Sequence, residues 1–248
     1  MHGLSLTLRH YYDFGRDRPL VGSDLTNPES WDILRTKTSG AFSLPATREE
    51  FVRAATQQAD IAARASAIDE WLDKQGANAV ASYGVGGAAL EWCMYQLRPD
   101  RELIITDYGE ATVERLAEVF PEAQVRYHDL LRDGPLAADA HLFHRIDTEF
   151  SNQELLGVLR RFGSASILVV VARVLDTRGL LREVLNRPRL KLRGASRAGF
   201  IRTSAAFDAL WRPTHLAQRI RVNDLDAWSL VPRAQRSQDQ TAASPAEM

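Results

Sequence analysis

Apolar and polar residues follow two different patterns along the chain. After the helix-capping sequence TREE (Thr47–Glu50), apolar side chains recur with approximately helical spacing. This pattern predicts a helix from Thr47 to about Lys74 that stops at Gly76. Residues 1–45 show little periodicity and contain several proline breaks, so we predict an irregular segment with short helices there.

From residue 78 onward, short apolar runs alternate with helical patterns. The apolar runs predict strands at 79–84, 102–107, 123–129, 139–147 and 166–175, and a closing hairpin at 215–222 and 225–231. The intervening patterns predict helices at 88–97, 110–120, 151–162 and 203–211, and residues 177–202 look less regular. The run SILVVVARVL is the most apolar, so it is the best candidate for a buried central strand.

Strand–helix alternation of this kind favours an α/β fold with right-handed parallel crossovers, that is, a doubly wound Rossmann-like sheet. We predict three regions. Residues 1–76 form an N-terminal irregular segment and helical cap, and residues 77–233 form the Rossmann-like domain. Residues 234–248 are polar and read as a disordered tail.

Three glycines stand at the first strand–helix turn, where open α/β sheets bind nucleotides. Gly84, Gly86 and Gly87 leave the backbone bare, so a ligand can approach it and the following helix N-terminus closely. Asp107 ends the second predicted strand and Asp129 ends the third. A carboxylate at the first position suits ribose hydroxyls, and one at the second suits the amine of an adenine. The glycines and the two carboxylates together favour an adenosine ligand over a simple tight turn.

The order of these segments resembles class I S-adenosylmethionine-dependent methyltransferases. The resemblance covers roughly residues 78–232 and rests on VASYGVGGAALE, LIITDYGEATVERL, VRYHDL, HLFHRIDTEFSNQELLGVLRRF and the closing hairpin. It implies a seven-stranded sheet whose last strand is antiparallel, with the helix at 47–74 as a variable cap. It also implies methyl transfer from S-adenosylmethionine to a small-molecule acceptor.

The resemblance assigns cofactor-binding roles to particular residues. Gly84 and Gly86 would hold the methionine part, together with the neighbouring Ser82 and Gly87. Asp107 would bind the ribose hydroxyls, with Tyr108 beside it. Asp129 and the apolar Leu130 would hold the adenine.

Two departures from the family pattern keep other hypotheses open. Ser82 stands where the family usually has an acidic residue, and Ala88 replaces the third motif glycine. A cofactor-free Rossmann-like module that binds partners is therefore the second hypothesis. A nicotinamide oxidoreductase is the third, since Gly84–Ala89 also satisfies the dinucleotide fingerprint G-x-G-x-x-A.

Candidate chemistry beyond the cofactor comes from the end of the fourth predicted strand. His144, Asp147 and Glu149 would lie beyond its carboxyl end, where they could orient an acceptor or take its proton. No nucleophile–base pair is evident. Methyl transfer tolerates this absence because the cofactor carries the reactive group.

Composition narrows the setting. The net charge of -1 selects neither nucleic acid nor a membrane surface as a partner. A single cysteine and scattered histidines argue against a disulfide framework or a metal site, and favour a cytoplasmic protein. The six basic residues between 187 and 202 are interpreted as a solvated loop.

Overall fold

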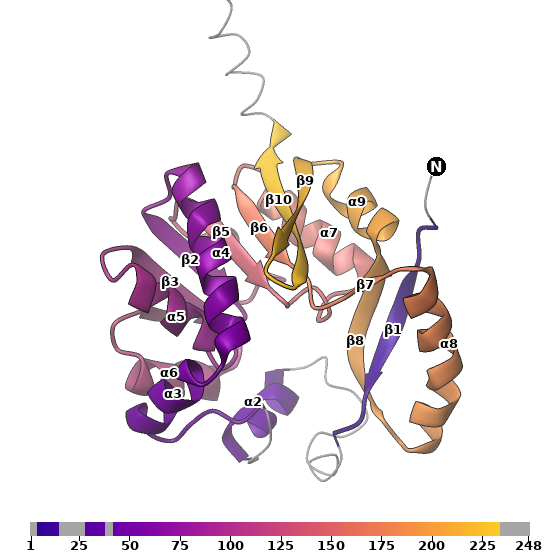
Figure 1. Cartoon of the computed structure of the whole chain (residues 1–248), viewed down its shortest axis with the longest axis horizontal. Coiled ribbons are helices and arrows are strands. Elements are labelled where there is room, and N and C mark those ends of the chain that lie inside the picture. Colours follow the sequence, from indigo (N-terminus) through magenta and orange to yellow (C-terminus); the bar gives the residue numbers. More distant parts are fainter. Residues whose placement is uncertain (1–3, 15–27, 38–41, 234–248) are drawn as a thin grey trace, which may run out of the picture.

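A seven-stranded sheet lies at the centre of the protein (Figure 1). The computed structural model describes residues 4–14, 28–37 and 42–233. The strands of this sheet are β2 (Ala79–Tyr83), β3 (Glu102–Asp107), β4 (Gln124–Tyr127), β5 (Ala140–His144), β6 (Ile167–Val170), β9 (His215–Val222) and β10 (Leu225–Pro232). Their order is β4-β3-β2-β5-β6-β10-β9, and β10 runs antiparallel to both of its neighbours. The predicted doubly wound sheet with an antiparallel last strand is confirmed.

Alternating side chains of the central strands build a core on each face of the sheet. In β2, Val80 belongs to one apolar cluster and Ala81 to the other. The first cluster includes apolar residues of α5 (Ala89–Leu97) and α6 (Glu110–Val119), and the second those of α7 (Asn152–Arg161) and α9 (Ser204–Trp211). Because both faces are covered, the central strands read as continuous apolar runs in the sequence. A capping box of Ser151 and Glu154 begins α7.

The predicted long N-terminal helix is two helices. α3 (Arg48–Thr56) and α4 (Ala59–Gln75) are separated at Gln57 and Gln58, and Gln58 has a non-helical backbone with φ -101° and ψ 82°. Phe51 of α3 packs against Trp92 and Phe120, whereas α4 packs against α5 and β9. Both helices therefore contact α5, to which Trp92 belongs, whereas α3 also contacts α6 and α4 also contacts β9. The break at Gln58 coincides with this change in the second packing partner. Gly76 ends α4 in the left-handed conformation, as predicted.

A second, three-stranded sheet was not predicted. It consists of β1 (Thr7–Tyr12), β8 (Ser196–Thr203) and β7 (Val174–Leu175), in the order β1-β8-β7. In Figure 1 it stands beside the main sheet with α8 (Thr177–Leu192) on its outer side, and α2 (Pro28–Lys37) lies across the gap between them. The prediction of short helices within residues 1–45 is confirmed by α2, but residues 7–12 form a strand instead of an irregular segment. The solvated-loop interpretation of 187–202 is wrong, because these residues belong to the end of α8 and to β8. β1 and β8 are far apart in the sequence and form a sheet by pairing with each other. No local sequence pattern indicates this pairing.

Three further findings concern the predicted regions of the chain. Among the described residues, no helix has both the length and the apolar character needed to cross a membrane. The tail predicted at 234–248 lies outside the described residues. The predicted boundary at residue 76 is crossed by the pairing of β1 with β8.

Candidate active site

The glycine turn after β2 has a left-handed backbone conformation that glycine adopts more readily than other residues. Gly84 and Gly86 adopt φ values of 61° and 60°, in the left-handed region that favours glycine. A Cβ on Gly84 would also lie 2.7 Å from a methyl carbon of Ile146. Gly87 has neither constraint, because a Cβ there would meet nothing within 4 Å and its φ is not positive. The turn therefore requires glycine at two of the three positions.

A carboxylate reaches Ser82 from the helix that follows the turn. Ser82 Oγ donates a hydrogen bond of 2.6 Å to Glu91 Oε1, and both residues are buried. Burial raises the pKa of Glu91 to about 7. The sequence analysis missed Glu91, although a lone acid within the apolar run AALEWCM was a signal. The family usually has an acidic residue at the position of Ser82. In this protein the carboxyl group of Glu91, from the next helix, lies beside that position and next to the glycine turn.

Asp107 holds the glycine turn in place. Its Oδ2 accepts a hydrogen bond from the Gly86 amide and its Oδ1 accepts one from the Gly109 amide, both at 3.1 Å. Arg35 of α2 places Nη1 3.3 Å from the same Oδ2. The carboxylate is 1% exposed. The predicted ribose-binding residue is therefore at the expected strand end, but α2 covers it.

Three side chains of α2 fasten it over the carboxyl ends of the strands. Trp31 Nε1 donates to Glu149 Oε2 at 3.1 Å, and Asp32 Oδ1 accepts from Thr112 Oγ1 at 3.0 Å. Arg35 completes the set through Asp107. The position of α2 was not predictable, since nothing in its sequence names a packing partner.

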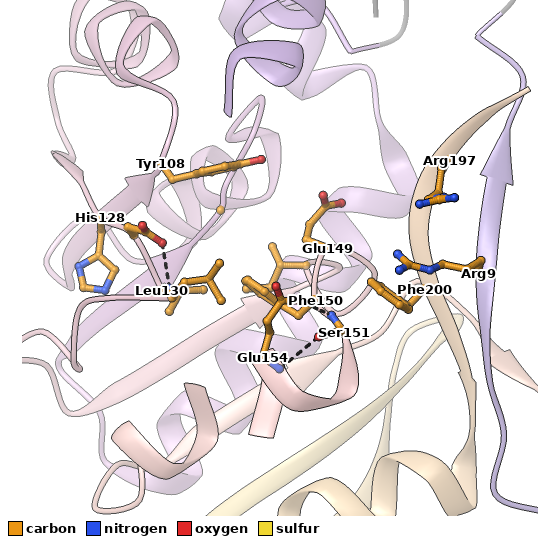
Figure 2. Close-up of a pocket in the computed structure, with 14 residues that line it drawn as sticks. Arg9, Tyr108, His128, Leu130, Glu149, Phe150, Ser151, Glu154, Arg197 and Phe200 are labelled. Atoms are coloured by element: carbon orange, nitrogen blue, oxygen red, sulfur yellow. Dashed lines mark hydrogen bonds between the residues drawn. The ribbon is translucent and has the colours of Figure 1, made fainter. Parts of the chain in front are cut away.

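A cavity of about 380 Å³ lies beside these contacts (Figure 2). Its lining comes from strand ends, from the loop after β5, from the start of α7 and from the small sheet: Arg9, Gly84, Tyr108, His128, Asp129, Leu130, Leu131, Ile146, Glu149, Phe150, Ser151, Glu154, Arg197 and Phe200. Four predicted cofactor residues, Gly84, Tyr108, Asp129 and Leu130, are thus brought together. Ser82, Gly86, Gly87 and Asp107 stand outside this lining, with Gly86 and Asp107 joined to each other behind it.

Of the three predicted catalytic residues, only Glu149 lines the cavity. Its carboxylate accepts hydrogen bonds from Trp31 Nε1 and, at 3.3 Å, from Thr148 Oγ1. Burial raises the pKa of Glu149 to about 7, which suits an acid or base working near neutral pH. Asp147 and His144 point elsewhere. Asp147 is buried and accepts from the Ala172 amide at 3.2 Å, and burial raises its pKa to about 6.

His144 is not placed to exchange protons with a ligand in the cavity. Burial lowers the pKa of its imidazole to about 3, so the ring is neutral at physiological pH. Within the described ranges, histidine, cysteine and carboxylate side chains do not gather into a group of three that could hold a metal ion.

The small sheet forms one wall of the cavity and is fixed to the main sheet by two residues of β8. Gly199 has a φ of 107°, and a Cβ there would lie 2.0 Å from the backbone oxygen of Thr148. The buried Arg202 donates to the backbone oxygens of Asp147 and Phe150 and to Asn152 Oδ1. These contacts seat β8 directly on the loop that carries Glu149. Arg197 belongs to the basic segment that was interpreted as a solvated loop, and its position in the cavity wall, like that of Arg9, was not predicted because the small sheet was not predicted.

Sequence comparison gives no relatives: no family model matches the chain, and no match was found among curated proteins. Structure comparison gives many. Human N-acetylserotonin methyltransferase in complex with SAM has a TM-score of 0.54 at 16% identity, over 68% of this chain and 51% of that one. Mitomycin 7-O-methyltransferase has a TM-score of 0.54 at 15% identity, over 69% of this chain and 53% of that one.

A candidate O-methyltransferase from Nostoc punctiforme also has a TM-score of 0.54, at 13% identity, over 86% of this chain and 69% of that one. The chain thus spans about half the length of the first two structures. At these identities the likeness establishes a shared fold: the protein has the Rossmann-like fold of class I methyltransferases.

Proposed function

We propose that this protein is an S-adenosylmethionine-dependent methyltransferase that acts on a hydroxyl group of a small molecule. One observation carries the proposal. A single cavity joins Gly84, Tyr108 and Asp129, at the carboxyl ends of three adjacent strands, to the carboxyl group of Glu149. In open α/β sheets, ligands bind at this edge of the sheet. The shared fold, and neighbours described as O-methyltransferases, support the same activity.

The residues present fit the adenosine part of the cofactor. Gly84 leaves its backbone bare, Tyr108 and Leu130 offer apolar surfaces, and Asp129 offers a carboxylate at the adenine end. Glu91, hydrogen-bonded to Ser82 beside the glycine turn, places a carboxyl group near the region expected for the methionine ammonium, and a bound ammonium would favour its ionised form. Binding of the ribose by Asp107 requires Arg35 to leave it, so we propose that α2 shifts when the cofactor enters.

The chemistry divides simply between cofactor and protein. When bound, S-adenosylmethionine supplies a methyl group on a positively charged sulfur. The protein orients the acceptor and excludes water, which contributes about 7–11 kcal/mol to lowering a barrier in well-aligned systems. Glu149 in its ionised form would accept the proton of the acceptor hydroxyl. His144 and Asp147 would act only through the structure around Glu149.

Isothermal titration calorimetry with S-adenosylmethionine and with S-adenosylhomocysteine tests the proposal. We expect binding of both. Asp107→Asn is expected to weaken it strongly and also to lower the melting temperature, because Asp107 accepts hydrogen bonds from the Gly86 and Gly109 amides and pairs with Arg35. Absence of heat and of any thermal shift at about 1 mM ligand would mean a binding free energy weaker than about 4 kcal/mol and would reject the proposal.

The contact of Arg35 with Asp107 favours a second candidate, a cofactor-free Rossmann-like module that binds a protein partner. In that case the guanidinium would be a permanent substitute for the sugar, and no adenosine compound would bind. Calorimetry on Arg35→Ala separates the two. If the variant also fails to bind S-adenosylhomocysteine, the cofactor-free module is favoured.

A further inference from the structure

We infer that the outer face of α8 docks on an anionic lipid membrane, with its leucines below the headgroups and its arginines among them. The inference goes beyond the proposed function and does not depend on it. It rests on the way in which charged and apolar side chains are divided between the two faces of this helix.

The face of α8 that packs on the small sheet is charged. Glu183 is 5% exposed, and its carboxylate lies 3.8 Å from Nδ1 of His10 and 3.4 Å from Nη1 of Arg173. Arg187 donates to the backbone oxygen of Arg9 in β1. The contacts that hold α8 in place are therefore largely polar, and they leave the larger apolar residues of the helix to be explained.

The face of α8 that is turned to solvent is apolar. Leu181, Val184, Leu185 and Leu192 are between 48% and 89% exposed, and their spacing places them on one side of the helix. They are four of the ten large apolar side chains that are exposed in the described part of the chain. Single exposed apolar residues are ordinary, but a cluster of them marks an interaction surface. We call these four residues the apolar stripe of α8.

Positive charges border the apolar stripe. By their helical spacing, Arg178, Arg182 and Arg189 lie along one edge of it and Lys191 lies along the other, and all four are exposed. The single acid of α8, Glu183, lies on the buried face. The exposed face of the helix is therefore apolar and cationic, and an occupant that complements it is apolar and anionic. The net charge of the whole chain hides this face, because acids elsewhere balance it.

The shape of the surface favours a membrane over a protein partner. An apolar stripe between basic residues is the pattern of a helix that lies in the interface of an anionic bilayer. In Figure 1, α8 is a single helix on the outer side of the small sheet, so it presents a ridge. A bilayer accommodates a ridge, whereas a partner protein usually holds a helix in a groove. A second copy of this chain is disfavoured, because two copies of α8 would bring like charges together.

Membrane docking through α8 would leave the cavity of the candidate active site accessible. Arg9 of β1 lines the cavity, whereas the next residue, His10, contacts Glu183 of α8. The cavity and α8 therefore lie on opposite faces of the small sheet. We expect vesicle binding to be the same with and without S-adenosylhomocysteine, so the inference and the proposed function can fail separately.

Flotation of the full chain with lipid vesicles tests the inference. We expect binding to phosphatidylcholine vesicles that contain about 30% phosphatidylserine, at least about tenfold tighter than to phosphatidylcholine alone, and weaker binding as the salt concentration rises. Leu181→Ser/Leu185→Ser should weaken this binding by about tenfold or more, because less apolar surface enters the bilayer. Arg178→Gln/Arg182→Gln/Arg189→Gln should weaken it by about 100-fold, that is, about fivefold for each charge.

Matched controls separate this surface from general stickiness or charge. Leu97→Ser changes an exposed leucine of α5, and Arg53→Gln/Lys74→Gln/Arg160→Gln removes three exposed cations outside α8. Both controls should bind the anionic vesicles within about threefold of the wild type, and all variants should keep the wild-type melting temperature.

Several outcomes would overturn the inference. They are the absence of binding to the anionic vesicles, equal binding to both kinds of vesicle, and controls that lose as much affinity as the α8 variants. Sedimentation analysis covers the alternative of a second copy. A dimer that Leu181→Ser/Leu185→Ser dissociates, without vesicle binding, would assign the apolar stripe to self-association instead.

Discussion

Arg35 Nη1 lies 3.3 Å from Asp107 Oδ2, so a cation of α2 is paired with the carboxylate that we propose as the ribose ligand. The same guanidinium lies against the turn, where a Cβ on Gly86 would meet its nitrogen at 3.0 Å. Arg35 is 8% exposed and Asp107 is 1% exposed. Under the proposed function, a sugar and this arginine would compete for one carboxylate.

Removal of the competitor should tighten cofactor binding. We expect Arg35→Ala to lower the Kd for S-adenosylhomocysteine by about tenfold or more, because a charge-assisted contact of about 1.5–3 kcal/mol no longer has to be broken. Asp107→Asn should change the affinity in the opposite direction. Calorimetry gives both values, and weaker binding by Arg35→Ala would show that the arginine contacts the ligand instead of displacing it.

Glu149 should control the pH dependence of methyl transfer. Only the ionised carboxylate can accept a proton, and its pKa is about 7, so the rate should rise as the pH increases through 7. Glu149→Gln should remove this dependence and slow the reaction by about 10²–10⁴-fold, with the affinity for S-adenosylhomocysteine unchanged. Rates would be measured with a small hydroxylated compound that the wild-type protein methylates. A variant with wild-type kcat would exclude Glu149 as the base.

Trp31 offers an independent check on the same carboxyl group. Its indole N–H donates to Glu149 and so favours the ionised form. Trp31→Phe keeps an aromatic ring but removes the donor, so the pKa of Glu149 should rise. The rising limb of the pH–rate profile should therefore move to higher pH, and a limb that stays in place would contradict the assignment.

Glu91 should make stability depend on pH. Its pKa is about 7 in the folded state, against an ordinary value of 4.5 for an exposed glutamate, so folding favours the protonated form. The stability that the protonated carboxyl allows is fully present below pH 4.5 and is lost as the pH rises through 7. Since one pKa unit corresponds to about 1.36 kcal/mol, the loss is on the order of 3 kcal/mol. Glu91→Gln keeps an acceptor for Ser82 and should remove this loss.

Urea denaturation at pH 5 and pH 8 measures the effect as a difference. The free energy of unfolding of Glu91→Gln minus that of the wild type should be larger at pH 8 by about 2–3 kcal/mol. Glu114→Gln, a change at an exposed carboxylate, serves as the matched control and should show no such trend. A pH-independent difference for Glu91→Gln would mean that the buried carboxyl ionises normally.

Gly199 should be intolerant of any side chain. Its φ of 107° is unfavourable for other residues, and a Cβ would overlap the Thr148 oxygen at 2.0 Å. We expect Gly199→Ala to destabilise the protein by about 2–4 kcal/mol, through backbone strain and overpacking. Gly134→Ala is the control, because its Cβ would meet nothing within 4 Å. Comparable unfolding midpoints in urea for the two variants would contradict this seating of β8.

The sequence was informative where structure depends on local pattern, and uninformative where it depends on distant pairing. The strand-end positions of Gly84, Asp107 and Asp129 followed from alternation and spacing, and so did the antiparallel hairpin at Asn223. The pairing of Arg9 with Phe200 joins strands about 190 residues apart, and no short-range signal announces it.

Covering contacts set a second limit. The spacing of Asp107 in the sequence predicts a carboxylate that is free to bind a ligand. The three-dimensional structure is needed to see that Arg35 is paired with this carboxylate. Similarly, the three candidates His144, Asp147 and Glu149 are equivalent in sequence, whereas backbone direction places one in the cavity and two outside it.

Because the small sheet forms only when β1 pairs with β8, the two walls of the cavity are expected to form at different stages of folding. The strands at the proposed cofactor end, β2, β3 and β4, lie between residues 79 and 127. The small-sheet wall of the cavity forms only when residues 7–12 pair with residues 196–203. Closing so long a loop is entropically costly and slow compared with local steps. We therefore expect a late step in refolding at which the seven-stranded core is formed but β1 and β8 have not yet paired.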